Sequence, residues 1–523
     1  MKKLSLLGVL LACGAAAFAA DPNPDIIIFN GRVFTPQSPL AFAQALAINE
    51  NRITAVGTDQ EISALADAGT KRIDAGGRLV IPGINDAHVH FQVLPPVFSL
   101  LTTPDSTFEE VKAAIAGAVD ETPPDSQIFG IIGAPTFFDH NATAQAIDAV
   151  APGRIVMLTE FTGHGAILST PALNAFAGAS PVDPIGGSFD HNAQGQLNGK
   201  VFEYAQYGLL RKLADSTGDP ENIDALRALS DQALAFGITT LQVMPTMAAR
   251  RFETLVEKAK VRVRIRTMRI PITDQASLNV ADNQGGGIRA VKWILDGTPI
   301  EHGAALRVSY PGSGTSGTIN FTEQQIRDVL AGALSRQEQP LLHVAGDRTA
   351  AMVLKVMKAM GTPAQWTERR PRFEHGDGVH RDLIRDVAGL GVIVVQNPTH
   401  LPFRSLYPEG DYMFLKTLLA RDVRLAFGSD GPLNPFLNIS IAVTHPAVPT
   451  EAISVAEALR AYTSGSAFAE KVDDKGIIAA GQLADIAILS ENLFKTRPPG
   501  MADTVSVLTI VNGKIAFDAG VLP

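Results

Sequence analysis

The feature that most constrains the fold is a series of eight short apolar segments, separated by helix-like patterns, in the middle of the chain. The residues 225–236 and 323–337 are examples of those helical patterns. Strands that alternate with helices favour a parallel α/β sheet, and eight such units predict a (β/α)8 (TIM) barrel. A doubly wound sheet would show the same alternation, but no Gly-x-Gly-x-x-Gly loop opens a helix. The predicted strands are 79–91, 237–244, 262–270, 288–297, 340–347, 370–376, 391–398 and 424–430.

The two ends of the chain carry a different pattern, in which short strands are broken by turn residues. An apolar run at 26–29 leads into Asn30-Gly31, and another at 507–511 leads into Asn512-Gly513, both typical of hairpins. Two β-rich ends around a helical middle predict one small β-domain made of 20–82 together with 470–523. The barrel domain is then expected to span 83–469.

A long segment, 92–236, separates the first two predicted barrel strands. It contains a strand-like run of its own at 155–158. Because insertions that follow barrel strands lie on the active-site face, we expect this insertion to cover the pocket and to influence specificity.

The composition limits the function classes and the possible metal ligands. The 523 residues have a formal net charge of −9 and contain no block of consecutive basic residues, so a nucleic-acid partner is not expected. The single cysteine, Cys13, excludes a disulfide framework and a cysteine-ligated zinc site. Any metal must therefore be held by histidine, by carboxylates or by a less usual ligand.

The first 19 residues have the pattern of a signal peptide. Lys2 and Lys3 precede an apolar run at 4–12, and Ala17 and Ala19 are the small residues that a signal peptidase requires. We expect an exported protein, periplasmic or secreted, that is cleaved after Ala19. A lipoprotein anchor at Cys13 is the weaker alternative, because the apolar run before it is short. No other apolar stretch is long enough for a transmembrane span, so a soluble protein is expected.

The strongest chemical signal is the pair His88 and His90 at the end of the first predicted strand. Residues two apart on a strand face the same way, so both imidazoles can point at one metal ion. Such a pair is weak evidence by itself, because buried histidines are often satisfied by the backbone. His343, His375 and Asp430 also lie near strand ends, where barrel enzymes carry their catalytic groups.

Lys292 interrupts the apolar strand 288–297, where an unpaired ammonium would be costly. One interpretation is a buried ion pair with Asp296 or a neighbouring carboxylate. The other is that burial lowers the pKa of the lysine, so that its neutral amine takes up CO₂ and forms a carbamate. The two carbamate oxygens, four histidines and Asp430 would then hold two divalent cations, and such oxygen and nitrogen ligands suit Zn²⁺.

These motifs resemble the amidohydrolase superfamily and, within it, amidohydrolase family 3, which includes N-substituted formamide deformylase. The resemblance runs in order from about residue 25 to the C-terminus, and it is carried by 82–90, 292–297, 343–348, 374–376, 396–400 and 429–430. It implies a metal-dependent hydrolase whose barrel is flanked by a β-sandwich. It also implies a role for each residue of the site: His88 and His90 hold the more buried metal, His343 and His375 hold the more exposed one, carboxylated Lys292 bridges them, and Asp430 is the acid/base.

The expected function is therefore hydrolysis of a non-peptide carbon–nitrogen bond in a small amide, formamide or cyclic amide. Asp430, His343 and Lys292 are the expected catalytic residues. Candidates for substrate contact are His164, Arg348, Gln396, His400, Trp293 and Phe137.

Two alternative functions stay open. A mononuclear deaminase of the same superfamily would not need Lys292, and an exported binding protein would not need the acid/base Asp430. A homodimer is compatible with the sequence.

Overall fold

The computed structural model describes residues 23–35, 42–94, 97–178, 180–278, 288–410 and 412–523. The predicted signal peptide (1–19) and Cys13 lie outside the described residues. Within the described ranges, no helix combines the length and the apolar character needed to cross a membrane.

Eight parallel strands form the barrel, which confirms the predicted fold. They pair in two arcs, β16-β15-β8 and β17-β18-β19-β20-β21. Backbone hydrogen bonds join the arcs, because Lys292 N donates to Arg269 O at 2.8 Å and Asp430 N donates to His88 O at 3.0 Å. The strands are β8 (Ile84–Phe91), β15 (Ile238–Pro245), β16 (Arg264–Thr267), β17 (Ala290–Ile294), β18 (Gln339–Val344), β19 (Arg372–His375), β20 (Ile393–Gln396) and β21 (Leu425–Phe427).

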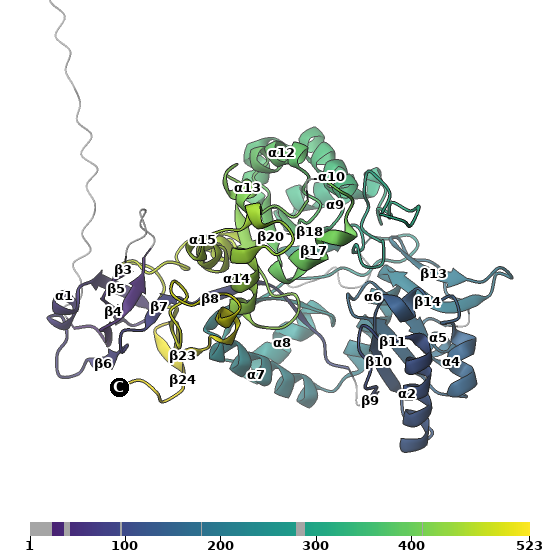
Figure 1. Ribbon diagram of the computed structural model, residues 1–523, viewed down its shortest axis with the longest axis horizontal. Coiled ribbons are helices and arrows are strands. Elements are labelled where there is room, and N and C mark those ends of the chain that lie inside the picture. Colours follow the sequence, from purple (N-terminus) through teal and green to yellow (C-terminus); the bar gives the residue numbers. More distant parts are fainter. Residues whose placement is uncertain (1–22, 36–41, 95–96, 179, 279–287, 411) are drawn as a thin grey trace, which may run out of the picture.

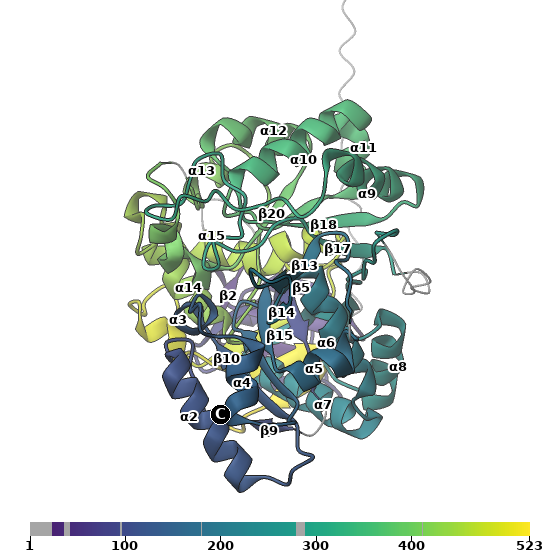
Figure 2. The same ribbon diagram turned by 90° about the vertical axis from the view of Figure 1, so that its right-hand side faces the viewer.

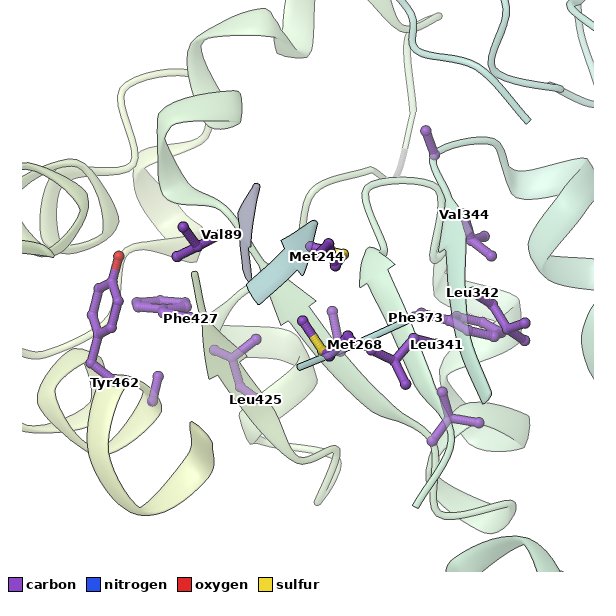
Figure 3. Packing of buried hydrophobic residues seen from close by; sticks show 14 of the residues in the cluster. Val89, Met244, Met268, Leu341, Leu342, Val344, Phe373, Leu425, Phe427 and Tyr462 are labelled. Carbon is purple, nitrogen blue, oxygen red and sulfur yellow. The ribbon is translucent and has the colours of Figure 1, made fainter. Parts of the chain in front are cut away.

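Apolar side chains from different barrel strands pack in one core cluster. Met244, Met268, Leu341, Phe373 and Phe427 all belong to it and are buried (Figure 3). The helices that alternate with the strands contribute their apolar faces to the same cluster. They are α7 (Asp219–Ala235), α8 (Ala249–Ala259), α9 (Glu323–Ser335), α10 (Asp347–Met360), α11 (Pro363–Arg369), α12 (Ile384–Gly389), α13 (Lys416–Leu419), α14 (Pro435–Thr444) and α15 (Val455–Arg460). The short helix α16 (Ser466–Ala469) packs in a separate small cluster with Ala87 and Val395.

The predicted first strand, 79–91, is in fact two strands that belong to different sheets. β7 (Leu79–Pro82) pairs with terminal strands, whereas β8 begins the barrel. The chain passes between them at Gly83, where any Cβ would collide with the side chain of Thr239. The continuous apolar run concealed this break because both strands are buried.

Two sheets made from the chain ends pack as a β-sandwich, as the resemblance implied. One is β5-β4-β1-β6, and the other, β24-β23-β22-β7-β2-β3, combines N- and C-terminal strands. Ile28 and Leu46 of the first sheet share an apolar cluster with Val80 and Ile488 of the second. The strands are β1 (Ile26–Phe29), β2 (Arg32–Phe34), β3 (Phe42–Ala43), β4 (Ala45–Asn49), β5 (Arg52–Gly57), β6 (Lys71–Asp74), β22 (Ile486–Leu489), β23 (Ser506–Val511) and β24 (Lys514–Asp518). The exact domain limits stay a prediction.

The insertion forms a six-stranded sheet, where the sequence predicted a single strand. Its order is β13-β14-β12-β11-β10-β9, and it lies on the side of the barrel away from the sandwich (Figures 1 and 2). The strands are short, and β12 and β14 pair out of sequence order, so local patterns did not reveal the sheet. The elements are β9 (Phe98–Ser99), α2 (Phe108–Glu121), β10 (Ile128–Ile132), α3 (Ala134–Phe137), α4 (Ala144–Val150), β11 (Val156–Glu160), β12 (Gly165–Leu168), α5 (Thr170–Phe176), β13 (Gly187–His191), β14 (Leu197–Glu203) and α6 (Tyr204–Ser216).

Candidate metal centre

Asp430 lies at the centre of a cluster of histidines at the carboxyl ends of the barrel strands. Its Oδ1 is 3.5 Å from Nε2 of both His88 and His90. Its Oδ2 is 3.6 Å from His375 Nδ1 and 3.7 Å from His400 Nε2. Asp430 therefore belongs to two sets of possible metal ligands, one with His88 and His90 and one with His375 and His400. Within each set the ligand atoms lie within 4.8 Å of one another. Nitrogen and oxygen donors at this spacing fit divalent metal ions such as Zn²⁺.

Close contact between the first and last barrel strands brings Asp430 to His88. A Cβ at Gly428 would collide with the backbone and Cβ of His88, so only glycine allows this approach. Asp430 then adopts a left-handed φ of 42° while its N–H donates to His88 O. The turn after β21 thus directs the carboxylate toward the His-x-His pair on β8.

Glu374 and Arg372, both on β19, orient the imidazole of His88 through its Nδ1 side. Glu374 Oε2 is 2.6 Å from His88 Nδ1, and Arg372 donates two hydrogen bonds to the same carboxylate at 2.7 and 3.0 Å. Burial alone would raise the pKa of Glu374, but Arg372 and His88 outweigh it and lower that pKa to about 2. An ionised carboxylate on Nδ1 leaves Nε2 of His88 free for a metal.

The electrostatics of the cluster also fit metal ligation. Burial lowers the pKa values of His88, His343 and His375, so these imidazoles are neutral, which is the form that binds metals. Burial opposes ionisation of Asp430, but the adjacent histidines outweigh it and lower the pKa of this carboxyl below its usual range. His88, His343 and His375 therefore present neutral nitrogens beside an ionised carboxylate, whereas burial of His400 is outweighed by Asp377 and Asp430, which raise its pKa.

The structure groups His400 with His375 and Asp430, where the resemblance implied His343. The ring of His343 lies 4.4 Å from that of His375, and its Nε2 is 3.4 Å from Gly297 O. His343 therefore lines the centre without belonging to either of the two ligand sets. His400, expected only to contact substrate, belongs to the second set with His375 and Asp430.

Lys292 is buried beside the centre, with an exposed fraction of 2%. Its Nζ lies 3.5 Å from His88 Nε2 and 3.6 Å from Met244 Sδ. Burial lowers its pKa to about 8, against the opposing effects of Glu374 and Asp430. Among the described residues no carboxylate lies within 4.0 Å of Nζ.

The alternative partner of Lys292, Asp296, is occupied elsewhere. Its carboxylate accepts hydrogen bonds from Ala345 N and Gly346 N at 3.0 and 2.8 Å and from Thr349 Oγ1 at 2.7 Å. The interpretation of a Lys292–Asp296 ion pair is therefore wrong, because Asp296 anchors the loop after β18.

A cavity of about 830 Å³ opens above the cluster. Lys292, Asp377, Asp430 and five histidines line its floor. The rest of the described wall is uncharged and largely apolar, and it includes Phe161, Leu210, Ile300, Phe403 and Met413. The cavity therefore offers a polar floor and an apolar body.

Two of the six predicted substrate contacts, His164 and His400, line this cavity. The other four lie elsewhere. Trp293 follows Lys292 on a strand, so its side chain faces the opposite way and packs against Phe321 at 6.0 Å. Phe137 packs against Phe202 at 5.4 Å, Arg348 donates to Gly317 O at 2.6 Å, and Gln396 donates to Asp377 behind the cavity wall.

Three residues that the sequence did not single out orient the histidines. Glu374 contacts His88, Glu203 contacts His164 at 3.0 Å, and Asn397 Oδ1 lies 2.9 Å from His375 Nδ1. Glu374 and Asn397 lie within motifs that carried the resemblance, 374–376 and 396–400, and this was the available signal for them. The partner of Glu374, His88, is 286 positions away, so no local pattern could reveal the contact.

A cluster of carboxyl and hydroxyl groups joins the insertion to the loop after β17. The hydroxyl of Thr162 contacts the carboxyl groups of both Glu160 and Glu301, and Thr298 donates to Glu301. A hydroxyl has one hydrogen, so it can donate to only one carboxylate. The other carboxyl must carry a proton and donate to the hydroxyl.

Glu160→Gln tests this cluster through its pH dependence. Burial, and then Glu301, raise the pKa of Glu160. The stabilisation from protonated Glu160 is therefore complete at pH values below the ordinary pKa of a glutamate. It declines as the pH rises toward the raised pKa that Glu160 has in the folded protein. Glutamine keeps an N–H donor but does not titrate. Between about pH 5 and about pH 8 we expect the melting temperature of the wild type to fall by about 2 °C more than that of the variant.

The measurement is thermal unfolding at both pH values. Glu109→Gln, on the exposed surface of α2 in the same insertion, is the control and should follow the wild type. Parallel pH profiles of wild type and Glu160→Gln would contradict a protonated carboxyl in this cluster.

A closed barrel whose strand ends gather two histidine–aspartate metal sets defines a metal-dependent hydrolase of the amidohydrolase superfamily. The model of amidohydrolase family 3, described as an amidohydrolase family, matches residues 71–517. The chain belongs to this family.

Relatives and solved structures match almost the whole chain. Protein LONG AFTER FAR-RED 3 of Arabidopsis thaliana is 26% identical and is matched over 94% of this chain and 91% of its own. The N-substituted formamide deformylase of Arthrobacter pascens is 24% identical over 94% of this chain and 98% of its own. An uncharacterized metal-dependent hydrolase from Pyrococcus horikoshii has the same fold, with a TM-score of 0.68 and 19% identity over 90% of this chain and 98% of its own.

Proposed function

We propose that this protein is a binuclear metal-dependent amidohydrolase that cleaves a non-peptide carbon–nitrogen bond in a small, neutral amide. The observation that carries the proposal is Asp430, whose two oxygens face two histidine sets at the floor of one cavity. Similarity to an N-substituted formamide deformylase supports an amide or formamide substrate. With the signal-like first 19 residues, we also propose export to the periplasm or the medium.

The proposed metal ligands come from four strand ends. His88 and His90 hold one ion, and His375, with His400 or His343, holds the other. Zn²⁺ suits these donors, and the ions when bound supply a water of lowered pKa and polarise the substrate carbonyl. Glu374 keeps Nε2 of His88 directed at its ion.

Lys292 is proposed to carry a carbamate. Its amine is buried beside His88 without a carboxylate within 4.0 Å among the described residues, so an ammonium would have no carboxylate in direct contact, only the more distant charges of Glu374 and Asp430. The ammonium first loses one proton; the neutral amine then adds CO₂, forming an N–C bond and releasing a second proton, and the product is a two-oxygen anion. That anion can bridge the two ligand sets.

Asp430 is proposed to move the proton during hydrolysis. Its position between both sets lets it accept a proton from the attacking water and donate it to the departing nitrogen. His343 lies beside His375 at the same floor, where it is proposed to contact the reacting groups.

The residues that line the cavity indicate that the substrate is neutral and has an apolar part. Apart from Lys292, none of its described lining residues is a lysine or an arginine that could pair with a substrate carboxylate. The apolar wall favours burial of hydrocarbon.

Metal analysis with a hydrolysis panel tests the proposal. We expect two equivalents of divalent metal per chain, loss of at least about 100-fold in amide hydrolysis after chelation, and recovery on adding Zn²⁺. One equivalent with release of ammonia from amino-substituted rings would instead indicate a mononuclear deaminase. Full metal content with no turnover of any small amide or cyclic amide would favour a binding protein.

A further inference from the structure

His164 belongs to the insertion but reaches the metal centre of the barrel. It lies between β11 and β12, is only 6% exposed and lines the cavity. Its ring centroid is 4.7 Å from that of His343. A polar side chain of the insertion thus lies beside the catalytic floor that the barrel strands build.

Glu203 holds this histidine by one nitrogen. Its two carboxylate oxygens lie 3.0 and 3.1 Å from His164 Nδ1, and its N–H donates to His164 O at 3.1 Å. A carboxylate can only accept, so Nδ1 must carry the hydrogen. Nε2 is then the ring nitrogen left for a ligand in the cavity.

Two features of the backbone accommodate the Glu203 carboxylate. Glu203 itself has a φ of 51° and a ψ of −125°, which residues other than glycine rarely adopt. Gly297, just after β17, lacks a Cβ that would lie 2.6 Å from Glu203 Oε1. Strained residues that surrounding structure maintains gather at functional sites.

The contacts of His164 and Glu203 fit a role in the active site better than a purely structural role. The Glu160–Thr162–Glu301 cluster already joins the insertion to the barrel. A structural link would not require the imidazole to line the cavity beside His343.

We infer that Glu203 is a positioning residue that fixes His164, so that His164 Nε2 hydrogen-bonds the scissile amide of the substrate. The insertion then completes the active site instead of only covering it. This inference rests on the proposed function for the nature of the substrate, and it assigns the contact that orients that substrate above the metal ligands.

Kinetics of four variants test the inference. His164→Gln should lower kcat about 100-fold, and Glu203→Gln about tenfold, with KM changed less than kcat. Gly297→Ala should resemble Glu203→Gln, because the added Cβ displaces the end of a flexible side chain. His191→Gln, an exposed histidine of the same insertion, should match the wild type. All four should keep the wild-type metal content and cooperative unfolding.

Nitrogen-15 NMR of the imidazoles gives a readout that needs no turnover. We expect a protected His164 Nδ1–H signal that disappears in Glu203→Gln and in Gly297→Ala. In the metal-loaded wild type, formanilide (a neutral amide with an apolar ring) should shift the His164 Nε2 resonance, and in His191→Gln it should do the same.

Unchanged kcat in His164→Gln, or a Nε2 resonance that formanilide does not move, would overturn the inference. So would loss of metal from His164→Gln, because the histidine would then serve the metal site. A wild type that hydrolyses no amide, yet shows the formanilide shift, would reject the hydrolase proposal and leave the contact supported.

Discussion

Asp430→Asn is expected to lower kcat by about 10³-fold while the bound metal stays largely in place. Asparagine keeps an oxygen beside the histidines, but its amide cannot accept and return a proton as a carboxylate does. The two oxygens of Asp430 lie 3.5–3.7 Å from nitrogens of four histidines, and for this reason we propose that the carboxylate is at the centre of the reaction. Steady-state kinetics and metal content, measured on the same preparation, check the prediction.

The control for this variant is Asp386→Asn. Asp386 lies on α12 and pairs with Lys358 on the outside of the barrel, so its loss should leave kcat unchanged. Undiminished turnover in Asp430→Asn would remove Asp430 from the mechanism. A loss of metal equal to the loss of activity would mean that the variant is inactive because it lacks metal, and would contradict the expected role of Asp430 as the proton carrier.

Lys292→Ala is expected to lose more than about 100-fold in activity and to regain part of it with acetate or propionate. The alanine leaves a space beside His88 that a small carboxylate can enter, and its two oxygens replace those of the proposed carbamate. Activity against acid concentration should saturate, and recovery should decline for longer acids that exceed the space.

Lys292→Met is the matched variant for this experiment. Methionine is similar in length and cannot be carboxylated, but it fills the space, so we expect loss of activity without rescue. If Lys292→Ala shows no recovery while metal stays at full stoichiometry, the lysine is structural and the carbamate proposal is wrong.

Local sequence patterns predicted the barrel and most of its floor. His88, His90 and His375 were found because each lies at the end of an apolar strand, and parallel strands in a barrel end on the same side. Asp430 was found in the same way, just after β21. Trp293 was misplaced although it lies on a correctly predicted strand, because alternation puts it on the face opposite Lys292.

The sequence by itself determined which elements exist and which residue types stand at their ends, since these depend on periodicity and on near neighbours along the chain. Only the tertiary structure decided that His400 joins His375, that Glu374 orients His88, and that Glu203 brings His164 to the floor of the cavity. Those contacts join residues far apart in sequence, and they depend on how closely the strands approach at positions such as Gly428 and Gly297. Distances of that kind follow from packing of the whole barrel and insertion, and no short segment encodes them.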